Sequence, residues 1–190
     1  MGVGVSGGVH GLTNGFCQMV GGDKGAYDYC VSLFDSLSKP SATHTYFGTG
    51  GAGHFVKMVH NGIEYGMMQS LAEGFGVLAK SLYKLNLQTV AKNYQQGSIV
   101  MSFLLDMIAD ALQKDPTLAQ TKGIIGSTGE GEWTIAAGKE LGASVEVIEK
   151  SLEFRKKSEY DKSVQDSFTA KLVQAMRHEF GGHGEPKPQG

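Results

Sequence analysis

The sequence predicts a mainly α-helical domain preceded by a short α/β segment. The first 48 residues hold short runs of β-type residues around one helical stretch. From Leu85 onward, apolar residues recur at helical spacing. Between these parts, residues 48–79 are apolar except for a few regularly spaced polar side chains. We therefore expect residues 1–48 to form the α/β part and residues 49–190 the helical domain.

The composition is that of a folded chain with many glycines. Of the 190 residues, 41% are hydrophobic, 19% are charged and 28 are glycine, whereas glycine usually makes up about 7% of a protein. Because the hydrophobic content is ordinary, the glycines indicate tight turns and close packing rather than disorder. A net charge of -2 provides no electrostatic footprint for nucleic acid or an anionic membrane. No apolar run is long enough to span a bilayer.

The cysteines and histidines give no sign of a metal site. Cys17 and Cys30 lie in apolar stretches without metal-ligand spacing, so we expect reduced core thiols and a cytoplasmic protein. The six histidines fit no zinc pattern.

The α/β part is expected to contain three strands and one helix. Asn14-Gly15 is typical of a tight turn between two strands, and Lys39-Pro40 should end the helix. The expected ranges are strands at Gly2–Val9, Phe16–Val20 and Thr43–Phe47, and a helix at Lys24–Leu37.

The central run predicts one long helix. Lys57, Asn61, Glu64 and Met68 follow one another at steps of four, three and four, which places them on one helix face. The other directions are apolar, so we expect the helix to be buried nearly all round. The apolar residues are Phe55, Val56, Met58, Val59, Ile63, Met67, Leu71 and Phe75.

Lys57 and Glu64 are a candidate catalytic pair. They stand two turns apart, roughly 10 Å along the helix axis, too far for a direct ion pair and suited to gripping opposite ends of a small substrate. Burial lowers the pKa of an amine and raises that of a carboxyl group, which suits such groups to general base and general acid roles. A purely structural role is an equal alternative from spacing alone.

Gly48, Gly50 and Gly53 form a G-x-G-x-x-G between a strand and a helix. A dinucleotide-binding fingerprint also needs a second strand and an acidic residue about 20 positions on, and here the helix continues past that point. We interpret the glycines as a sharp turn that exposes amide donors beside Lys57.

The remainder is predicted to be helical, with a glycine-rich loop at Thr121–Glu132 and a mobile tail, GGHGEPKPQG. The expected helices are Leu87–Gln95, Val100–Lys114, Trp133–Leu141, Val145–Lys157 and Tyr160–Glu179. A long apolar helix in so short a chain is more easily buried by a second copy, so we expect a homo-oligomer.

Three segments carry a family resemblance. GAGHFVKMVHNGIEYGMMQ resembles the signature of decarboxylating 6-phosphogluconate dehydrogenases, and VSGGV and RHEFGGH match two further family segments in order. The short C-terminal half is similar to the shorter branch of the family. The resemblance implies that the first part is the end of a Rossmann-like dinucleotide-binding domain, whose main cofactor-binding segment is absent here. The second part would be an all-helical substrate-binding and oligomerisation domain.

The resemblance also implies an activity. The reaction would oxidise 6-phosphogluconate at C3 with NAD or NADP and release C1 as carbon dioxide, giving ribulose 5-phosphate. We expect this chain alone to lack turnover. The alternatives are a related 3-hydroxyacid dehydrogenase and a non-catalytic helical oligomerisation module.

Site roles follow residue by residue from the resemblance. Lys57 matches the general base, and Glu64 matches the acid that protonates C1 of the resulting enediol. Ser6, Gly7 and Gly8 match residues beside the sugar acid, and Val5 and Ser6 match residues at the cofactor. His60 and Asn61 match substrate-orienting residues, and Tyr65 and Arg155 match phosphate contacts. Arg177 and His183 match residues that reach the active site of a neighbouring subunit in a homodimer or homotetramer.

Each match has a structural alternative. Ser6-Gly7-Gly8 could be only a turn, His60 a core residue, and Arg155, in a stretch reading RKK, a solvated helix end. Arg177 could lie on the surface and His183 in the tail.

Two positions depart from the family pattern. Thr128 and Glu130 stand where longer members bind phosphate with a lysine and a threonine. Ser127 or Thr128 could still donate to phosphate, whereas Glu130 would repel it. His10 replaces a tryptophan, and the sequence gives no reason for that change.

Overall fold

The computed structural model describes residues 1–182 and divides into two compact units. The first unit comprises Met1–Ile63 and Glu130–Ala143, and the second comprises Glu64–Gly129 and the chain from Ser144 onward. The long helix α4 (Ala52–Ala79) contributes residues to both units. The domain boundary expected after residue 48 therefore stays a prediction.

The first unit contains a sheet of the three predicted strands. Strand β1 (Gly2–Ser6) pairs antiparallel with β2 (Cys17–Gly21), and β2 pairs parallel with β3 (His44–Gly48). The tight turn predicted at Asn14-Gly15 is wrong. The connection instead contains the 3-10 turn η1 (Gly8–His10) and the short helix α1 (Gly11–Asn14), which Gly15 ends with a φ of 85°. Gly15 is thus a helix cap rather than a hairpin residue.

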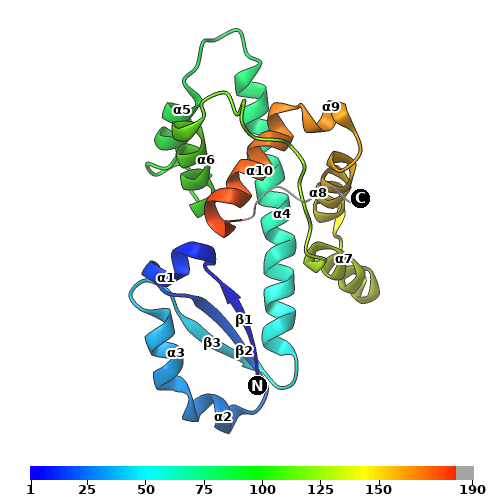
Figure 1. Cartoon of the computed structure of the whole chain (residues 1–190). Coiled ribbons are helices and arrows are strands. Elements are labelled where there is room, and N and C mark those ends of the chain that lie inside the picture. Colours follow the sequence, from blue (N-terminus) through cyan, green and yellow to red (C-terminus); the bar gives the residue numbers. More distant parts are fainter. Residues whose placement is uncertain (183–190) are drawn as a thin grey trace. The chain divides into compact units, whose positions relative to one another are not determined.

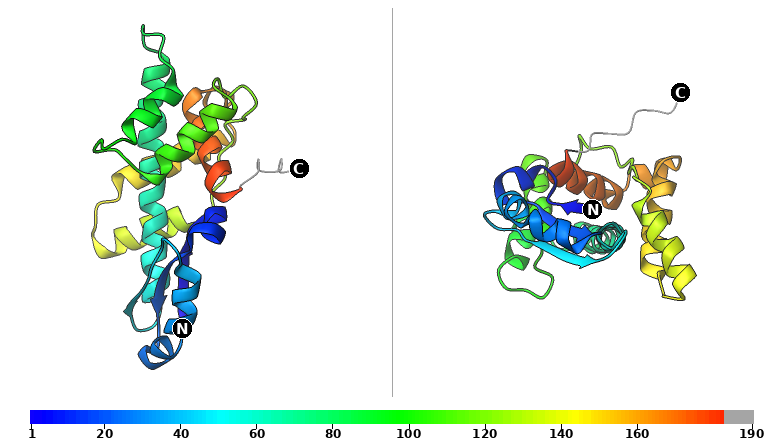
Figure 2. Two further views of the ribbon diagram at one scale, coloured as in Figure 1. Left: turned by 90° about the vertical axis from the view of Figure 1, so that its left-hand side faces the viewer. Right: turned by 90° about the horizontal axis from the view of Figure 1, so that it is seen from below.

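Two helices replace the single helix expected at Lys24–Leu37. These are α2 (Lys24–Tyr29) and α3 (Val31–Ser38), and the chain turns at Cys30, whose φ is -94° and ψ is 5°. Helix α3 is held against the sheet because the Gln18 amide donates to the carbonyl of Phe34 at 3.0 Å and to Ser38 Oγ at 2.9 Å. Figures 1 and 2 show α3 and the first half of α4 on opposite sides of the sheet.

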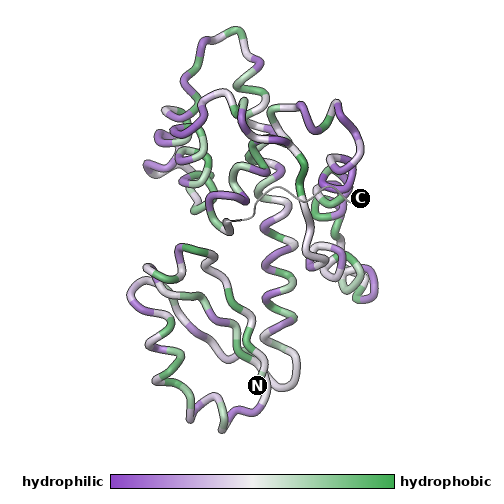
Figure 3. The backbone as a smooth tube through the Cα atoms, in the orientation of Figure 1, coloured by the Kyte–Doolittle hydropathy of each residue, from purple (hydrophilic) through white to green (hydrophobic). Residues whose placement is uncertain are grey.

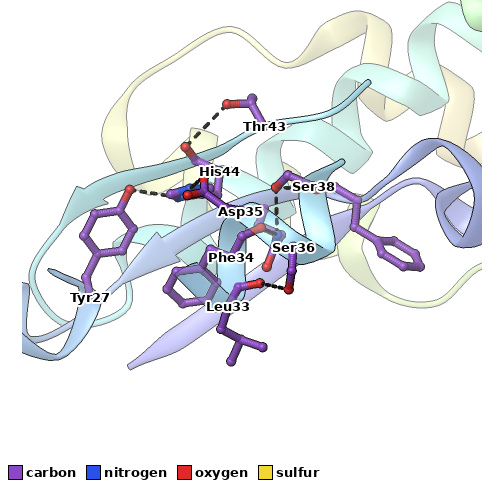
Figure 4. A network of polar contacts seen from close by, with 10 residues as sticks. Tyr27, Leu33, Phe34, Asp35, Ser36, Ser38, Thr43 and His44 are labelled. Carbon is purple, nitrogen blue, oxygen red and sulfur yellow. Dashed lines mark hydrogen bonds and ion pairs between the residues drawn. The ribbon is translucent and has the colours of Figure 1, made fainter. Parts of the chain in front are cut away.

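A polar network joins α2, α3 and β3 (Figure 4). His44 Nε2 lies 3.1 Å from a carboxylate oxygen of Asp35, and Tyr27 Oη lies 2.9 Å from His44 Nδ1. Because an ionised carboxylate only accepts, Nε2 carries the hydrogen, and in the neutral ring Nδ1 accepts from the tyrosine. The network ties α2 and α3 to strand β3.

Glycines allow the first half of α4 to lie very close to its neighbours. A Cβ on Gly4 would overlap Lys57 Cβ and lie 2.9 Å from its Cγ. A Cβ on Gly53 would lie 2.7 Å from the amide nitrogen of Gly21. On another side, helix α7 (Glu130–Leu141) approaches so closely that a Cβ on Gly62 would lie 2.6 Å from Thr134 Cγ2. Close packing explains why glycine stands at these three positions.

The second unit is all helical. Besides the second half of α4, it contains α5 (Leu87–Tyr94), α6 (Phe103–Lys114), α8 (Glu146–Ser158), α9 (Lys162–Gln165) and α10 (Phe168–Gly181). Figure 3 shows α6 alternating between hydrophobic and hydrophilic colours, as expected for a helix with one buried face. The fully buried core side chains include Met68, Phe75, Leu105, Ile108, Leu112, Leu118, Ile125, Leu172 and Met176.

Several predicted boundaries in the helical part are wrong, for local reasons. Helix α6 begins at Phe103 rather than Val100, because Ser102 is extended with φ -166° and ψ 158°. The last predicted helix is interrupted between α9 and α10, where Ser167 Oγ accepts from the amide of Ala170 at 3.2 Å and caps α10. Helix α7 begins at Glu130, inside the predicted loop.

The expectation that α4 is buried nearly all round is also wrong for this chain. Phe55, Ile63, Met67 and Val77 are 46%, 52%, 43% and 72% exposed. Among residues 1–182, no helix has the length and apolar character needed to cross a membrane. Cys17 and Cys30 are free thiols and only half-buried.

Candidate active site

The first half of α4 presents a lysine and an asparagine on one face, as the spacing predicted. Lys57 Nζ donates a hydrogen bond to Asn61 Oδ1 one turn further on. Both side chains are half-buried. The amine is therefore held in place while remaining reachable from solvent.

His60 links this pair to the end of strand β1. Its Nδ1 lies 2.9 Å from Asn61 Oδ1, and its Nε2 lies 3.2 Å from Ser6 Oγ. Ser6 is followed by Gly7 and Gly8, whose φ angles of 143° and 51° are disfavoured for residues with a side chain. The Ser6-Gly7-Gly8 turn is thus formed, and its serine points to a histidine of the candidate site.

Glu130 completes this group; the sequence marked it as a departure at a family phosphate-binding position but did not predict this contact. Asn61 Nδ2 donates to Glu130 Oε2, across 69 sequence positions. Helix α7 is anchored by Thr134, whose hydroxyl lies 2.7 Å from the carbonyl oxygen of Met58. No periodicity in the sequence could connect positions on two different helices. We call Ser6, Lys57, His60, Asn61 and Glu130 the amine cluster; all belong to the first unit.

A second group lies within the second unit. Arg155 is only 3% exposed, and its guanidinium carbon lies 3.3 Å from the centre of the Tyr65 ring. Its Nη2 also lies 3.5 Å from the sulfur of Met68. The alternative that Arg155 is a solvated helix end is therefore wrong. Stacking over an aromatic face is a favourable environment for a desolvated guanidinium.

Arg177 belongs to the same group. It is 7% exposed, and its Nη1 donates to Gln174 Oε1 at 2.7 Å. Burial lowers its pKa, whereas Tyr65 and Glu64 of the same chain favour the charged form. The alternative that Arg177 lies on the surface is therefore wrong, and its contribution to a neighbouring subunit's site stays a prediction. We call Glu64, Tyr65, Arg155 and Arg177 the arginine cluster.

The arginine cluster carries an excess of positive charge. Burial lowers the pKa of Arg155 to about 10; Tyr65 and Glu64 oppose this shift, and the neighbouring Arg177 adds to it. Both arginines remain cationic near neutral pH, with Glu64 as the carboxylate that acts on both. Two buried guanidinium groups with one carboxylate form a site to which an anion would add favourable electrostatic energy.

The other predicted residues are less informative. Val5 is 44% exposed on β1. Ser127 and Thr128 are exposed, and His10 is half-buried in η1. His183 lies outside the described residues. Within the described part of the chain, no group of three His, Cys, Asp or Glu side chains could hold a metal ion.

Comparison with known proteins gives first the fold class. A solved 3-hydroxyisobutyrate dehydrogenase from Salmonella typhimurium superimposes with a TM-score of 0.62 at 15% sequence identity, covering 90% of this chain and 58% of that chain. At this identity the likeness concerns the fold alone. The shared fold is one in which an α/β part precedes a helical part.

The family follows from closer matches. The profile described as "6-phosphogluconate dehydrogenase, C-terminal domain" matches residues 53–166, and that of the "NAD binding domain of 6-phosphogluconate dehydrogenase" matches residues 1–51. The chain belongs to the 6-phosphogluconate dehydrogenase family.

Individual relatives support the same family assignment. A Bacillus subtilis relative is 43% identical over 184 residues, covering 97% of this chain and 60% of its own length. The NAD(+)-dependent, decarboxylating 6-phosphogluconate dehydrogenase of Haloferax volcanii is 37% identical over 181 residues, with coverages of 95% and 59%. The solved 6-phosphogluconate dehydrogenase of Plasmodium falciparum has a TM-score of 0.71 at 34% identity, covering 83% of this chain and 36% of that chain. The chain thus spans about three fifths of the first two relatives.

Proposed function

We propose that this chain supplies the substrate-binding part of an enzyme that converts 6-phosphogluconate to ribulose 5-phosphate and carbon dioxide, with reduction of NAD or NADP. The arginine cluster is the observation that carries the proposal. Two guanidinium groups desolvated beside Tyr65 are suited to a phosphate dianion, which can accept several charge-assisted hydrogen bonds. Family membership supplies the particular sugar acid.

The amine cluster is proposed to carry out the proton transfers of the oxidation. Lys57, in its neutral form, accepts the C3 hydroxyl proton of the substrate as the C3 hydride leaves. It then returns that proton to the new carbonyl oxygen, which polarises the ketone. The polarised β-keto acid loses C1 as carbon dioxide because the electrons of the breaking bond flow into the carbonyl group. His60, Asn61 and Ser6 hold the substrate hydroxyl groups.

Glu64 is proposed to complete the reaction as the general acid. Loss of carbon dioxide leaves an enediol. A protonated carboxyl group on Glu64 can deliver its proton to C1 of that enediol, which was C2 of the substrate, while the Lys57 amine takes the proton of the neighbouring enediol hydroxyl group, which gives ribulose 5-phosphate. Glu64 belongs to the arginine cluster. The family resemblance assigns both roles to helix α4: Lys57 is the base, and Glu64, two turns further along, is the acid.

The end of strand β1 fits the nicotinamide part of a cofactor. Val5 is 44% exposed there, and Gly7 and Gly8 present backbone without side chains next to Ser6. A bound NAD or NADP would supply the acceptor for the C3 hydride. Val5 and Ser6 are the residues proposed to hold it.

We also propose that the active form is a homodimer or homotetramer. The support is the apolar face of α4 that this chain leaves exposed. The contribution of His183 to a neighbouring subunit's site is part of the same proposal.

Ligand-dependent thermal stability tests the proposal. 6-Phosphogluconate should raise the melting temperature, because a ligand at 100 times its dissociation constant stabilises a folded protein by about 2.7 kcal/mol. Gluconate, which lacks the phosphate, should give a much smaller shift. Arg155→Lys, which loses the planar fork, and Lys57→Ala should reduce the shift, whereas Lys80→Ala, at an exposed cation just after α4, should not.

Other outcomes distinguish the alternatives. An unchanged melting temperature at millimolar 6-phosphogluconate would overturn the assignment and favour a non-catalytic module. A larger shift with a phosphate-free 3-hydroxy acid would favour a related 3-hydroxyacid dehydrogenase.

A further inference from the structure

Glu130 is the member of the amine cluster that no family segment in the sequence assigned. It is the first residue of α7, and its half-buried carboxylate accepts a hydrogen bond from Asn61 Nδ2. The N-terminus of a helix favours a negative charge, so the position suits an ionised carboxylate.

The hydrogen bond to Glu130 determines which way the Asn61 amide faces. An ionised carboxylate can only accept, so Asn61 must turn its NH₂ group toward Glu130. Its Oδ1 then faces Lys57 and His60. The two orientations of an asparagine amide have nearly the same shape. A partner that can only accept is therefore needed to select one of them.

The amide orientation in turn determines the tautomer of His60. With Asn61 Oδ1 at 2.9 Å, His60 Nδ1 must carry the hydrogen. In the neutral ring Nε2 is then the acceptor, and it lies 3.2 Å from Ser6 Oγ. Lys57 Nζ lies 3.4 Å from the same Nδ1; since both would be donors, Asn61 Oδ1 is the acceptor that serves them both.

We propose that Glu130 is a positioning residue: through Asn61 it fixes the Nδ1-H tautomer of His60 and the placement of the Lys57 amine. Its importance for catalysis rests on the proposed function, but the hydrogen-bond relay does not. In this arrangement His60 Nε2 and the Ser6 hydroxyl are set to receive a substrate hydroxyl group, and the Lys57 amine is held beside them. As a positioning residue, Glu130 acts through its hydrogen bond with Asn61.

The experiment reads the His60 tautomer directly in the unliganded chain. Ring nitrogen chemical shifts of ¹⁵N-histidine-labelled protein distinguish Nδ1-H from Nε2-H, at a pH where the ring is neutral. The His60 signals are assigned by their loss in His60→Gln. The parent should show Nδ1-H as the major form, and Glu130→Ala should lose that preference.

Two further variants keep the result interpretable. In Glu130→Gln the side-chain oxygen can still accept from Asn61, so the Nδ1-H form should be retained. In Glu130→Lys the ammonium can only donate, so Asn61 should reverse and Nε2-H should become the major form. Glu132→Gln, at an exposed residue of the same first helical turn, makes the same charge change as Glu130→Gln and should leave the tautomer unchanged.

An unchanged His60 tautomer in both Glu130→Ala and Glu130→Lys would overturn the relay. Circular dichroism verifies that each variant is folded, and Glu130→Lys remains informative if Glu130→Ala does not fold. Because this measurement uses no substrate, its failure is distinct from a failure of 6-phosphogluconate binding.

Discussion

The carboxylate of Asp115 organises the turn that follows α6. Its Oδ2 accepts from the amide of Gln120 at 2.8 Å, and its Oδ1 lies 3.3 Å from the amide nitrogen and 3.2 Å from the hydroxyl of Thr117. This turn contains Leu118, which has a φ of 53° although it is not glycine, and whose side chain is 1% exposed. The hydrogen bonds of Asp115 thus hold a disfavoured backbone conformation that delivers a leucine to the core.

These hydrogen bonds give a prediction for pH dependence. The backbone amide of Gln120, followed by those of Ala119 and Thr117, lowers the pKa of Asp115. A carboxyl group with a lowered pKa stabilises the folded state above its unfolded pKa, about 3.9, and this contribution is lost as pH falls through the folded pKa. Asp115→Asn should therefore melt below the parent at pH 7, and the difference should shrink below pH ~4.

The control is Asp110→Asn, because Asp110 is an exposed carboxylate on α6. It should change the melting temperature little at either pH. If the two variants show the same pH profile, the Asp115 hydrogen bonds do not stabilise the turn.

Single residues also show how far the sequence could predict the site. The spacing of Lys57 and Asn61 correctly placed both on one face of α4, because helical periodicity is a local property. The burial of Arg155 could not be predicted from the RKK stretch, since it depends on the Tyr65 ring from another helix. The hydrogen bond between Asn61 and Glu130 could not be predicted for the same reason, because the two residues are 69 positions apart and lie on different helices.

The long helix α4 contains two glycines in opposite environments. A Cβ on Gly62 would lie 2.6 Å from Thr134 Cγ2 and 3.0 Å from its Oγ1, whereas a Cβ on Gly74 would meet nothing within 4 Å. Alanine is favoured over glycine inside a helix by about 1 kcal/mol. Helix propensity by itself assigns both glycines the same cost.

Gly74→Ala should raise the melting temperature, since it gains helix propensity without a steric penalty. Gly62→Ala should lower it, because the displacement of α7 outweighs that gain. Thermal unfolding of both variants at low protein concentration, where self-association contributes least, tests the difference. A stabilised Gly62→Ala variant would show that α7 can move away freely.

Element boundaries were predicted less well than element types. The three strands and most helices were expected, because alternation and helical spacing extend over several residues. The break at Cys30 between α2 and α3 and the new start at Ser167 depend on single turns and caps, which leave little trace in a hydrophobic pattern.

For the molecule as a whole, α4 presents apolar side chains that the described chain does not cover. Ile63, Met67 and Val77 are 52%, 43% and 72% exposed. They recur at intervals of four and ten residues, which is consistent with one stripe along a helix. Single exposed apolar residues are ordinary, but a stripe of them is typical of an interface.

Lysines on this stripe should therefore prevent self-association. We expect Met67→Lys and Val77→Lys to shift the protein to a smaller species in size-exclusion chromatography with light scattering. Tyr29→Lys, which changes an 89% exposed side chain on α2, is the control and should leave the mass unchanged. A parent that is monomeric at all concentrations would contradict the proposed homo-oligomer.

The contact between Gly4 and Lys57 has a consequence for protein engineering. Any side chain at position 4 would collide with the base of the lysine side chain, since a Cβ there would overlap Lys57 Cβ and lie 2.9 Å from its Cγ and 3.0 Å from the backbone oxygen of Gly53. A change of rotamer cannot move Lys57 Cβ or that oxygen away, so strand and helix would have to separate. Position 4 is therefore closed to redesign, and directed evolution of this site has to leave that glycine in place.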